Sequence, residues 1–438
     1  MHLSELLTLS DSALKRACKY PSRRALFTHL SSMRGKHYVG IVGPRGAGKT
    51  ILLLQLALEM DDCFYLSLDT LDKEADLFGL IERLVGEYKF KNFFLDEIHF
   101  HKNPTGFLKK AYDFLDVKIY FTSSVALQMR ATAYDLSRRV LLYELRYLSF
   151  REFLKIKYGQ ELRMLSLDDL LNANISSEHL RSHARWSEYI NSGLLPFALE
   201  EPNALPLLRN IVQTVIRSDI PSLHPLMIAE IETIEKLLKF VGMSGVDGIN
   251  YSTLSNNLGI TKYKAEQYLS LLENAYLVQR LFPVGTNVMK EPKVLLTPPV
   301  RLLYRELDDS IGSLREDLAV SMLRPGVEEL HYLKASRGSK TPDFMILHRG
   351  EKIVFEVGGA NKGRKQFKGI TADRKIILRD GGELSKESVP LHCLGFLAQF
   401  EDELPNAEDK LDEDYLSLVS RNLEEWESDD DEEFGKSL

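Results

Sequence analysis

Short apolar runs alternate with amphipathic stretches between His37 and about residue 149. Continuous apolar runs are typical of strands buried on both faces, and helices between such strands favour a parallel sheet covered on both sides. A sheet of this kind binds its ligand at the carboxyl ends of its strands. The pattern predicts an α/β fold for residues 1–149, whose first 35 residues are mainly helical and basic. The five predicted strands are Tyr38–Val42, Cys63–Leu68, Phe93–Leu95, Ile119–Phe121 and Val140–Leu145.

The pattern changes after residue 149. Residues 150–222 are predicted to be a helical lid, with a turn at 191–193. Residues 223–299 form the next predicted unit, with a helix over Met227–Gly242, two shorter helices separated by Gly259, and an apolar strand over Tyr276–Val284. The two shorter helices are Thr253–Leu258 and Lys262–Glu273.

Residues 300–400 mix helical and strand patterns, which predicts an α/β unit. Its predicted helix is Leu314–Leu323, and its predicted strands lie near Phe344–Leu347, Lys352–Val357 and Lys375–Leu378. Residues 401–438 have low hydrophobicity and high charge, so we expect a disordered acidic tail. The chain of 438 residues is long enough for roughly two to four domains.

Charge is distributed unevenly along the chain. The net charge is −7, yet residues 401–438 carry sixteen acidic and three basic side chains, against 47 acidic and 53 basic in the remainder. A mildly basic body permits binding to double-stranded DNA without requiring it. The acidic tail either keeps the protein soluble or docks on a basic surface.

Cysteine usage and the absence of targeting patterns bear on the compartment. Cys18, Cys63 and Cys393 have neither metal-ligand nor disulfide-framework spacing. The first residues lack the basic-then-apolar pattern of a secretory signal, and no run approaches the ~20 apolar residues of a membrane helix. We therefore expect a cytoplasmic protein that makes no contact with membranes.

A phosphate-binding loop is predicted at 43–50. The segment fits the pattern G-x-x-x-x-G-K-[ST] between a predicted strand and a predicted helix. Glycines let backbone N–H groups surround phosphate oxygens, Lys49 bridges the β- and γ-phosphates, and the Thr50 hydroxyl binds Mg²⁺. The predicted nucleotide-binding residues are Gly43, Pro44, Arg45, Gly46, Ala47, Gly48, Lys49 and Thr50.

Two carboxylates end the predicted strand 93–95. Asp96 is expected to hold Mg²⁺, directly or through water, and Glu97 to act as general base on the attacking water. His99 and His101 follow closely. They are either loop residues or groups that position water.

These motifs resemble the AAA+ class of P-loop ATPases, which bind ATP with Mg²⁺. In that class a further strand ends in a polar residue that senses the γ-phosphate. The segment 118–124 fits this feature, with Thr122 or Ser123 as the candidate. The resemblance implies ATP hydrolysis by this part of the chain.

The segments 136–140 and 148–153 narrow the resemblance. They are similar to prokaryotic AAA+ ATPases with a winged-helix element and a C-terminal restriction-endonuclease-like domain, and residues 188–196 resemble the lid of that family. In those proteins a small residue and an arginine precede the last core strand. Arg139 matches the arginine and would complete a neighbouring subunit's site in a homo-oligomer; Arg138 departs from the family's glycine. Alternatively, Arg139 is a solvated surface residue.

Residues 250–284 resemble a winged helix. Its second helix carries polar side chains that would contact DNA in a major groove, but acidic residues share that helix. A unit of this type can also pack only against protein. The polar residues are Lys262, Lys264, Gln267 and Tyr268.

The last part of the chain resembles the PD-(D/E)XK nuclease core. In the order of that core, Glu316 lies on a helix while Asp343 and Glu356 lie on strands as metal ligands. Gly358 occupies the place of the usual lysine, and Lys362 is a candidate substitute. The site is either an active nuclease centre or an inactive remnant.

The sequence therefore predicts an AAA+ ATPase whose nucleotide state controls a DNA-binding or nuclease-like half. The alternative is a slow ATP-dependent interaction switch, in which the winged-helix and nuclease-like parts bind a protein partner. The basic body favours the first interpretation, and Gly358 favours the second.

Overall fold

Five parallel strands form the first sheet of the computed structural model, and they confirm the five strands predicted from the sequence. Their order across the sheet is β2-β3-β4-β1-β5. The strands are β1 (Tyr38–Val42), β2 (Cys63–Ser67), β3 (Asn92–Asp96), β4 (Lys118–Ser123) and β5 (Val140–Glu144). The structure describes residues 3–124, 138–245, 249–284, 291–327, 329–334, 341–381 and 383–400, so the predicted acidic tail lies outside the described residues.

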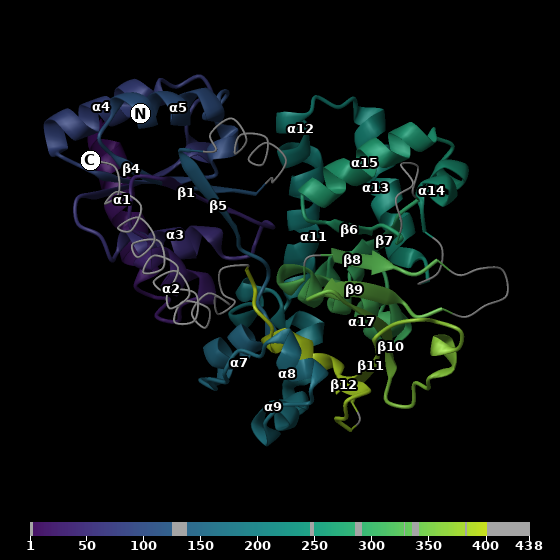
Figure 1. Cartoon of the computed structure of the whole chain (residues 1–438). Coiled ribbons are helices and arrows are strands. Elements are labelled where there is room, and N and C mark those ends of the chain that lie inside the picture. Colours follow the sequence, from purple (N-terminus) through teal and green to yellow (C-terminus); the bar gives the residue numbers. More distant parts are fainter. Residues whose placement is uncertain are drawn as a thin grey trace, which may run out of the picture.

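Helices cover both faces of this sheet because successive strand residues point to opposite sides. Side chains such as Tyr38 pack with α4 and α5, whereas Val39 packs with α2 and α3 on the other face. Figure 1 shows these layers at one end of the molecule. The helices are α1 (Leu3–Ala17), α2 (Ala25–Ser32), α3 (Lys49–Ala57), α4 (Leu77–Tyr88) and α5 (Pro104–Phe114).

The predicted helical lid region contains short helices and two π-helical turns, at Tyr189–Gly193 and Val215–Asp219. The first of these replaces the simple turn expected at 191–193. Ser149 and Glu152 form a capping box that fixes the start of α7. The helices are α7 (Phe150–Tyr158), α8 (Leu167–Leu171), α9 (Ser177–Arg181), α10 (Trp186–Glu188), α11 (Ala204–Thr214) and α12 (Ile220–Leu223).

Three helices and an antiparallel strand pair follow. The helices predicted from apolar periodicity and from the Gly259 turn are present, and Gly259 ends α14 with a φ of 64°. Strand β7 was not predicted and pairs with β6. The elements are α13 (Ile228–Met243), α14 (Tyr251–Leu258), α15 (Lys262–Asn274), β6 (Val278–Leu281) and β7 (Lys293–Leu296).

A second five-stranded sheet has the mixed order β12-β11-β10-β9-β8 and contains the three strands predicted after residue 300. Helix α17 (Leu307–Leu323) packs on β10, and a short helix α16 (Pro298–Arg301) precedes it. The two short edge strands, β8 and β12, were not predicted. The strands are β8 (Glu329–Tyr332), β9 (Phe344–His348), β10 (Glu351–Gly359), β11 (Arg374–Asp380) and β12 (Ser388–Pro390).

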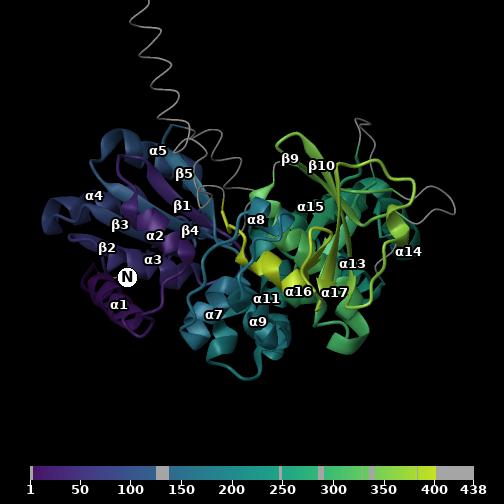
Figure 2. The same cartoon turned by 60° about the horizontal axis from the view of Figure 1, so that its bottom comes forward.

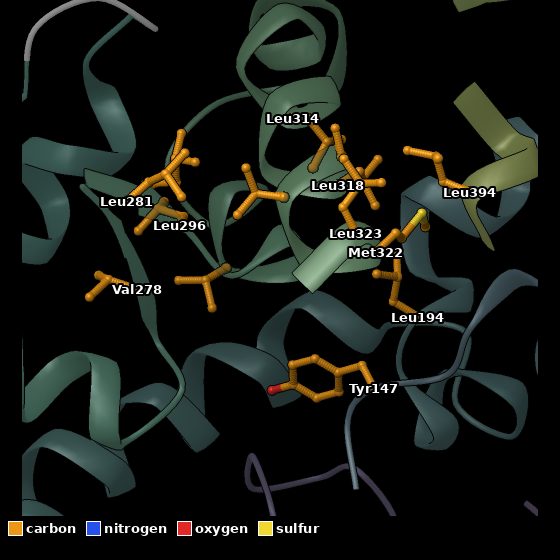
Figure 3. Packing of buried hydrophobic residues seen from close by; sticks show 14 of the residues in the cluster. Tyr147, Leu194, Val278, Leu281, Leu296, Leu314, Leu318, Met322, Leu323 and Leu394 are labelled. Carbon is orange, nitrogen blue, oxygen red and sulfur yellow. The ribbon is translucent and has the colours of Figure 1, made fainter. Parts of the chain in front are cut away.

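One continuous hydrophobic core joins the elements after the first sheet. Buried side chains from the lid region, the β6–β7 pair, α17 and the second sheet belong to the same cluster. Figure 3 shows part of it, with Leu194, Val278 and Leu318 among its members. In Figure 2, α7 and α9 lie between the first sheet and the C-terminal elements. The domain divisions at 150–222, 223–299 and 300–400 remain a prediction.

No helix among the described segments is both long and apolar enough to span a bilayer.

A buried ion pair joins α17 to α16, and a hydrogen bond ties the same aspartate to β7. Asp317 is fully buried, its carboxylate accepts the backbone N–H of Leu296 at 3.0 Å, and it pairs with Arg301. The Gln279 side chain donates to the carbonyl of Asp317 at 3.3 Å. Because each charge is removed from water, loss of one partner leaves the other buried without compensation.

We expect Asp317→Ala to destabilise this core by about 3–5 kcal/mol, because the Arg301 guanidinium would stay buried without its partner. The midpoint of urea unfolding, followed by fluorescence of the buried Trp186, measures the effect. Glu235→Ala is the matched control: it removes the partner of the exposed Arg217 and should cost less than about 1 kcal/mol. Equal losses in the two variants would contradict the assignment.

Candidate nucleotide site and acidic centre

The phosphate-binding loop lies where the prediction placed it, between β1 and α3. A side chain at Gly43 would lie 2.0 Å from the Leu145 carbonyl, so only glycine fits beside the end of β5. Gly48 directly precedes α3 with a φ of 93°, which an L side chain rarely adopts. The loop therefore has the close backbone path that phosphate binding requires.

Lys49 is held inside the loop. Its Nζ donates to the carbonyls of Gly43 and Pro44 at 2.9 and 3.1 Å, and to the Ser124 hydroxyl at 2.8 Å. The side chain is almost fully buried, and this burial lowers the pKa of Lys49. An incoming phosphate would therefore meet an ammonium group that is already at the loop and enclosed by polar partners.

Asp96, at the end of β3, collects three hydroxyl donors. Its carboxylate accepts hydrogen bonds from Thr50 at 2.8 Å, from Tyr65 at 3.0 Å and from Thr122. Burial, followed by the charge of Glu97, nevertheless raises the pKa of Asp96. A nearby cation would relieve this cost. The adjacent oxygens of Thr50 and Asp96 fit Mg²⁺, which takes few protein ligands in addition to phosphates.

Glu97 lies next to Asp96 in a left-handed backbone conformation, with a φ of 52°. Its carboxylate accepts the Ser124 hydroxyl at 2.8 Å and the Ser124 N–H at 3.1 Å, and its own N–H donates to Thr122 at 2.8 Å. Burial would raise the pKa of Glu97, but the charges of Lys49 and His99 outweigh burial and hold this pKa below its usual value. The group is thus ionised, as a base must be.

Thr122 and Ser123 are both fully buried at the end of β4. Thr122 contacts the acidic pair, whereas the Ser123 hydroxyl lies 3.3 Å from Nδ1 of His99. Burial lowers the pKa of His99, whose Nδ1 is also 3.3 Å from the Glu97 carboxylate. His101 lies apart from this cluster, where its Nδ1 accepts the Asn103 N–H at 3.2 Å.

The predicted lid region lies over the phosphate-binding loop. Arg45 donates to both oxygens of the fully buried Asp219 at 3.0 Å. A methyl group at Gly46 would lie 3.0 Å from the Phe197 ring and 3.1 Å from Ile211. The loop is therefore covered by side chains of residues that come after the predicted lid segment 188–196 in the sequence.

Arg139 directly precedes β5 and so lies at the amino ends of the strands, whereas the phosphate-binding loop lies at their carboxyl ends. Its carbonyl accepts the N–H of Tyr38 at the start of β1, and its guanidinium binds both Asp113 oxygens at 2.9 and 3.0 Å. Arg138 beside it is exposed. The structure does not bring Arg139 together with Lys49 or Glu97 of the same chain.

Comparison with models of protein families agrees with this geometry. Residues 35–154 match an AAA domain. The match supports a P-loop AAA+ ATPase with nucleotide-dependent activity in this part of the chain. Residues 183–298 match a second model, described as a domain of unknown function, DUF8612. None of the curated proteins compared with the chain matches it.

Several solved structures are also similar over much of the chain. The ORC1 protein of Aeropyrum pernix in complex with DNA is 12% identical over 72% of this chain and 94% of its own, with a TM-score of 0.30. AMPPCP-bound DnaA from Aquifex aeolicus is 18% identical over 62% and 89%, with a TM-score of 0.22.

The predicted DNA-contacting face of α15 is largely tied to the protein itself. Lys262 pairs with Glu291 at 3.1 Å, and Lys264 pairs with Glu230 at 3.3 Å. Tyr268 is buried and donates to the same Glu230 at 3.0 Å. Gln267 is exposed. The two lysine charges are therefore partly neutralised within the chain.

Three carboxylates predicted as nuclease-like residues meet beside the second sheet; we call Glu316, Asp343 and Glu356 the acidic centre. The Asp343 carboxylate accepts the Val357 N–H at 2.7 Å. Burial, with the charge of Asp343 adding to it, raises the pKa of Glu316 to about 8 and that of Glu356 to about 7. Crowded carboxylates of this kind need nearby positive charge.

Lys362 supplies part of that positive charge. Its side chain lies above Gly358, the position at which the resemblance leads us to expect a lysine. Its Nζ lies 2.5 Å from Oε1 of Glu356, and its stem fills the space above Gly358, where an added methyl group would lie 2.5 Å from it. Lys293 pairs in the same way with Glu316, at 2.5 Å. Within the described ranges, no three His, Cys, Asp or Glu side chains are arranged to hold a metal ion.

Three polar residues beside the phosphate-binding loop and the acidic pair were not predicted from the sequence. The positions of Tyr65 and Ser124 beside the acidic pair follow from the order of the strands, because β2 and β4 are the two neighbours of β3 in the sheet. Ser124 directly follows the predicted sensor pair, and its position one residue past the strand end was the available signal. Asp219 is 174 positions from Arg45 and had no signal in the local pattern.

Tyr65→Phe should destabilise the protein by about 1–3 kcal/mol, because a hydrogen bond to a buried carboxylate is lost while Asp96 stays buried. The shift of the urea midpoint measures this loss. Tyr158→Phe removes the same hydroxyl from a half-exposed contact with Glu188 and should change stability much less. A silent Tyr65→Phe would show that this hydroxyl does not support Asp96.

Proposed function

We propose that this protein binds ATP with Mg²⁺ at the loop 43–50, hydrolyses it, and couples its nucleotide state to the C-terminal half. One observation carries the proposal: Ser124 contacts both Lys49 and Glu97, while Thr122 contacts both Asp96 and Glu97. Phosphate ligand, metal ligand and base are thus joined in one buried network. Such preorganisation is what hydrolysis of a phosphoanhydride requires.

Each group has a distinct role in the proposed reaction. Backbone N–H groups of the loop and Lys49 would bind the β- and γ-phosphates, and the ionised Glu97 would take a proton from water. Thr50 and Asp96 would hold Mg²⁺, which neutralises phosphate charge when bound. Thr122 and Ser123 would position the acidic pair and His99, and Ser124 is a further candidate for contact with the γ-phosphate.

Arg139 is proposed to act on a neighbouring subunit of a homo-oligomer. Its place before β5, at the amino ends of the strands, supports action between subunits rather than within one, since the loop lies at their carboxyl ends and the guanidinium binds Asp113. The pair with Asp113 would have to open for this role. A purely structural pair on the surface is the alternative.

Glu97→Gln should still bind ATP but lose at least about a hundredfold in turnover, because the amide cannot accept the proton from water. Steady-state phosphate release measures turnover, and fluorescence of a labelled ATP measures binding. Glu87→Gln changes an exposed residue of α4 in the same way and should leave both unchanged. Normal turnover by the Glu97 variant would refute the role of this residue.

A second candidate function is metal-dependent cleavage of double-stranded DNA at the acidic centre, within a winged-helix and nuclease-like half. The position of Lys362 above Gly358 favours it, because the chain thereby restores a lysine beside Glu356. Asp343 and Glu356 would be the metal ligands, since carboxylate oxygens suit Mg²⁺. When bound, the ion would supply charge stabilisation to a phosphodiester.

The alternative is a slow ATP-dependent interaction switch with an inactive acidic centre and a protein partner. Two observations favour it. The lysines of α15 are already paired within the chain, which weakens the case for DNA contact. The carboxylates of Glu316 and Glu356 are likewise occupied by ammonium groups.

Plasmid cleavage separates these two functions. We expect cleavage with Mg²⁺ or Mn²⁺ in the presence of ATP and its loss in Asp343→Ala, because that variant lacks a proposed metal ligand. Asp373→Ala is the matched control, since its carboxylate accepts the backbone N–H of Lys352 and is not one of the three carboxylates of the acidic centre. Intact plasmid with both metals and in every nucleotide state would favour the interaction switch.

A further inference from the structure

Arg45 of the phosphate-binding loop is held by a carboxylate from outside the first sheet. Its Nη1 donates to both oxygens of Asp219 at 3.0 Å. The Asp219 side chain is fully buried, and no other group in the described segments donates to its carboxylate. A buried carboxylate without a partner carries a large desolvation cost, so this pair fixes where the guanidinium of Arg45 lies.

The pair uses only part of the guanidinium. Nε and Nη2 of Arg45 make no hydrogen bond within the described part of the chain, and 31% of the side chain is exposed. These two nitrogens form the edge with which Arg139 binds both oxygens of Asp113. The same edge of an arginine matches a phosphate group through two parallel hydrogen bonds. Asp219 therefore orients Arg45 while the edge that suits a phosphate stays available.

The electrostatics of the site place this pair beside the proposed catalytic groups. Burial lowers the pKa of Lys49, and the charge of Arg45 acts in the same direction. Burial would raise the pKa of Glu97, which the charges of Lys49 and His99, and then that of Arg45, hold down. Burial also raises the pKa of Asp219, and the charges of Arg45 and His99 act against it. An arginine that acts on both Lys49 and Glu97 lies toward the end of the loop where the γ-phosphate is proposed to bind.

Asp219 also connects Arg45 to the C-terminal half. It ends the π-helical turn Val215–Asp219, which packs on α13. Arg217 in the same turn donates to both carboxylate oxygens of Glu235 on α13, at 2.7 and 2.8 Å. Turns of this kind are rare and occur frequently at functional sites. A displacement of Asp219 would therefore act on the first helix of the predicted winged-helix unit.

We propose that Arg45 contacts the γ-phosphate of ATP bound to its own chain, and that Asp219 is the positioning residue that holds Arg45 for this contact. The unused edge of the guanidinium would take the phosphate while Nη1 stays on Asp219. Because ADP has no group at that place, the pair would favour ATP over ADP, and the predicted lid region would be tied to the phosphate only in the ATP state. This inference rests on the proposed binding of ATP at the loop 43–50.

The preference of the full chain for a nonhydrolysable ATP analogue over ADP tests the inference. Titration with fluorescent derivatives of both nucleotides, in the presence of Mg²⁺, gives the two dissociation constants. Arg45→Gln removes a charge-assisted contact made only with the third phosphate and should lower the preference about tenfold. Asp219→Asn keeps the volume but releases the guanidinium, and should lower the preference roughly threefold because preorganisation is lost. Glu161→Gln, which breaks an exposed pair with Lys155 in the predicted lid region, should leave it unchanged.

A double variant separates positioning from a merely structural role. If Asp219 acts through Arg45, the combination of Arg45→Gln and Asp219→Asn should have the same preference as Arg45→Gln alone, because residues that act as a unit are not additive. The double variant also leaves no buried charge without a partner, which covers loss of folding in Arg45→Gln. A lower melting temperature of Asp219→Asn, with an unchanged or higher preference for the ATP analogue, would overturn the inference.

The original protein distinguishes this inference from the proposed function. If it binds both nucleotides and the double variant keeps the same preference for the ATP analogue, only the roles of Arg45 and Asp219 fail. If it binds neither nucleotide, the proposed binding of ATP at the loop fails, and the inference fails with it.

Discussion

The common direction of the five strands in the first sheet is the constraint on which the nucleotide site depends. Parallel strands place all their carboxyl ends at one edge, so residues that follow β1, β3 and β4 meet there although they are far apart in sequence. Lys49, Asp96 and Ser124 are neighbours for this reason. The same rule places Arg139, which precedes β5, at the opposite edge.

The second constraint is that a buried charge needs a partner. Both candidate sites satisfy it by placing polar or positively charged groups against their buried carboxylates. In the first sheet, Lys49 and the hydroxyls of Thr50 and Thr122 surround the acidic pair. In the second, Lys293 and Lys362 stand against the acidic centre. Isolated carboxylates in such surroundings would carry a large desolvation cost. Each site is thus held together by positive groups that a cation or phosphate ligand would have to rearrange.

How much could be predicted from the sequence depends on whether a feature is local. Apolar runs such as 38–42 predicted their strands because burial on both faces leaves a continuous pattern. The short strand β12, with three residues, carries too few positions for any period to show. The motifs at 43–50 and 96–97 were found because phosphate and metal chemistry requires fixed spacing. Asp219 and Lys293 were missed because tertiary packing alone brings them to their sites.

The Lys362 hypothesis rested on a local feature of the sequence. A glycine in place of the usual lysine left room, and a lysine four residues later was close enough to fill it; the structure has that stem directly above Gly358.

The contact between the first sheet and the C-terminal half could not be predicted from local sequence patterns. Arg146, just after β5, pairs with Glu144 and donates to the carbonyl of Ser321 at 3.1 Å. Since Ser321 lies on α17, which carries Glu316, a displacement at the end of β5 would act directly on the helix of the acidic centre.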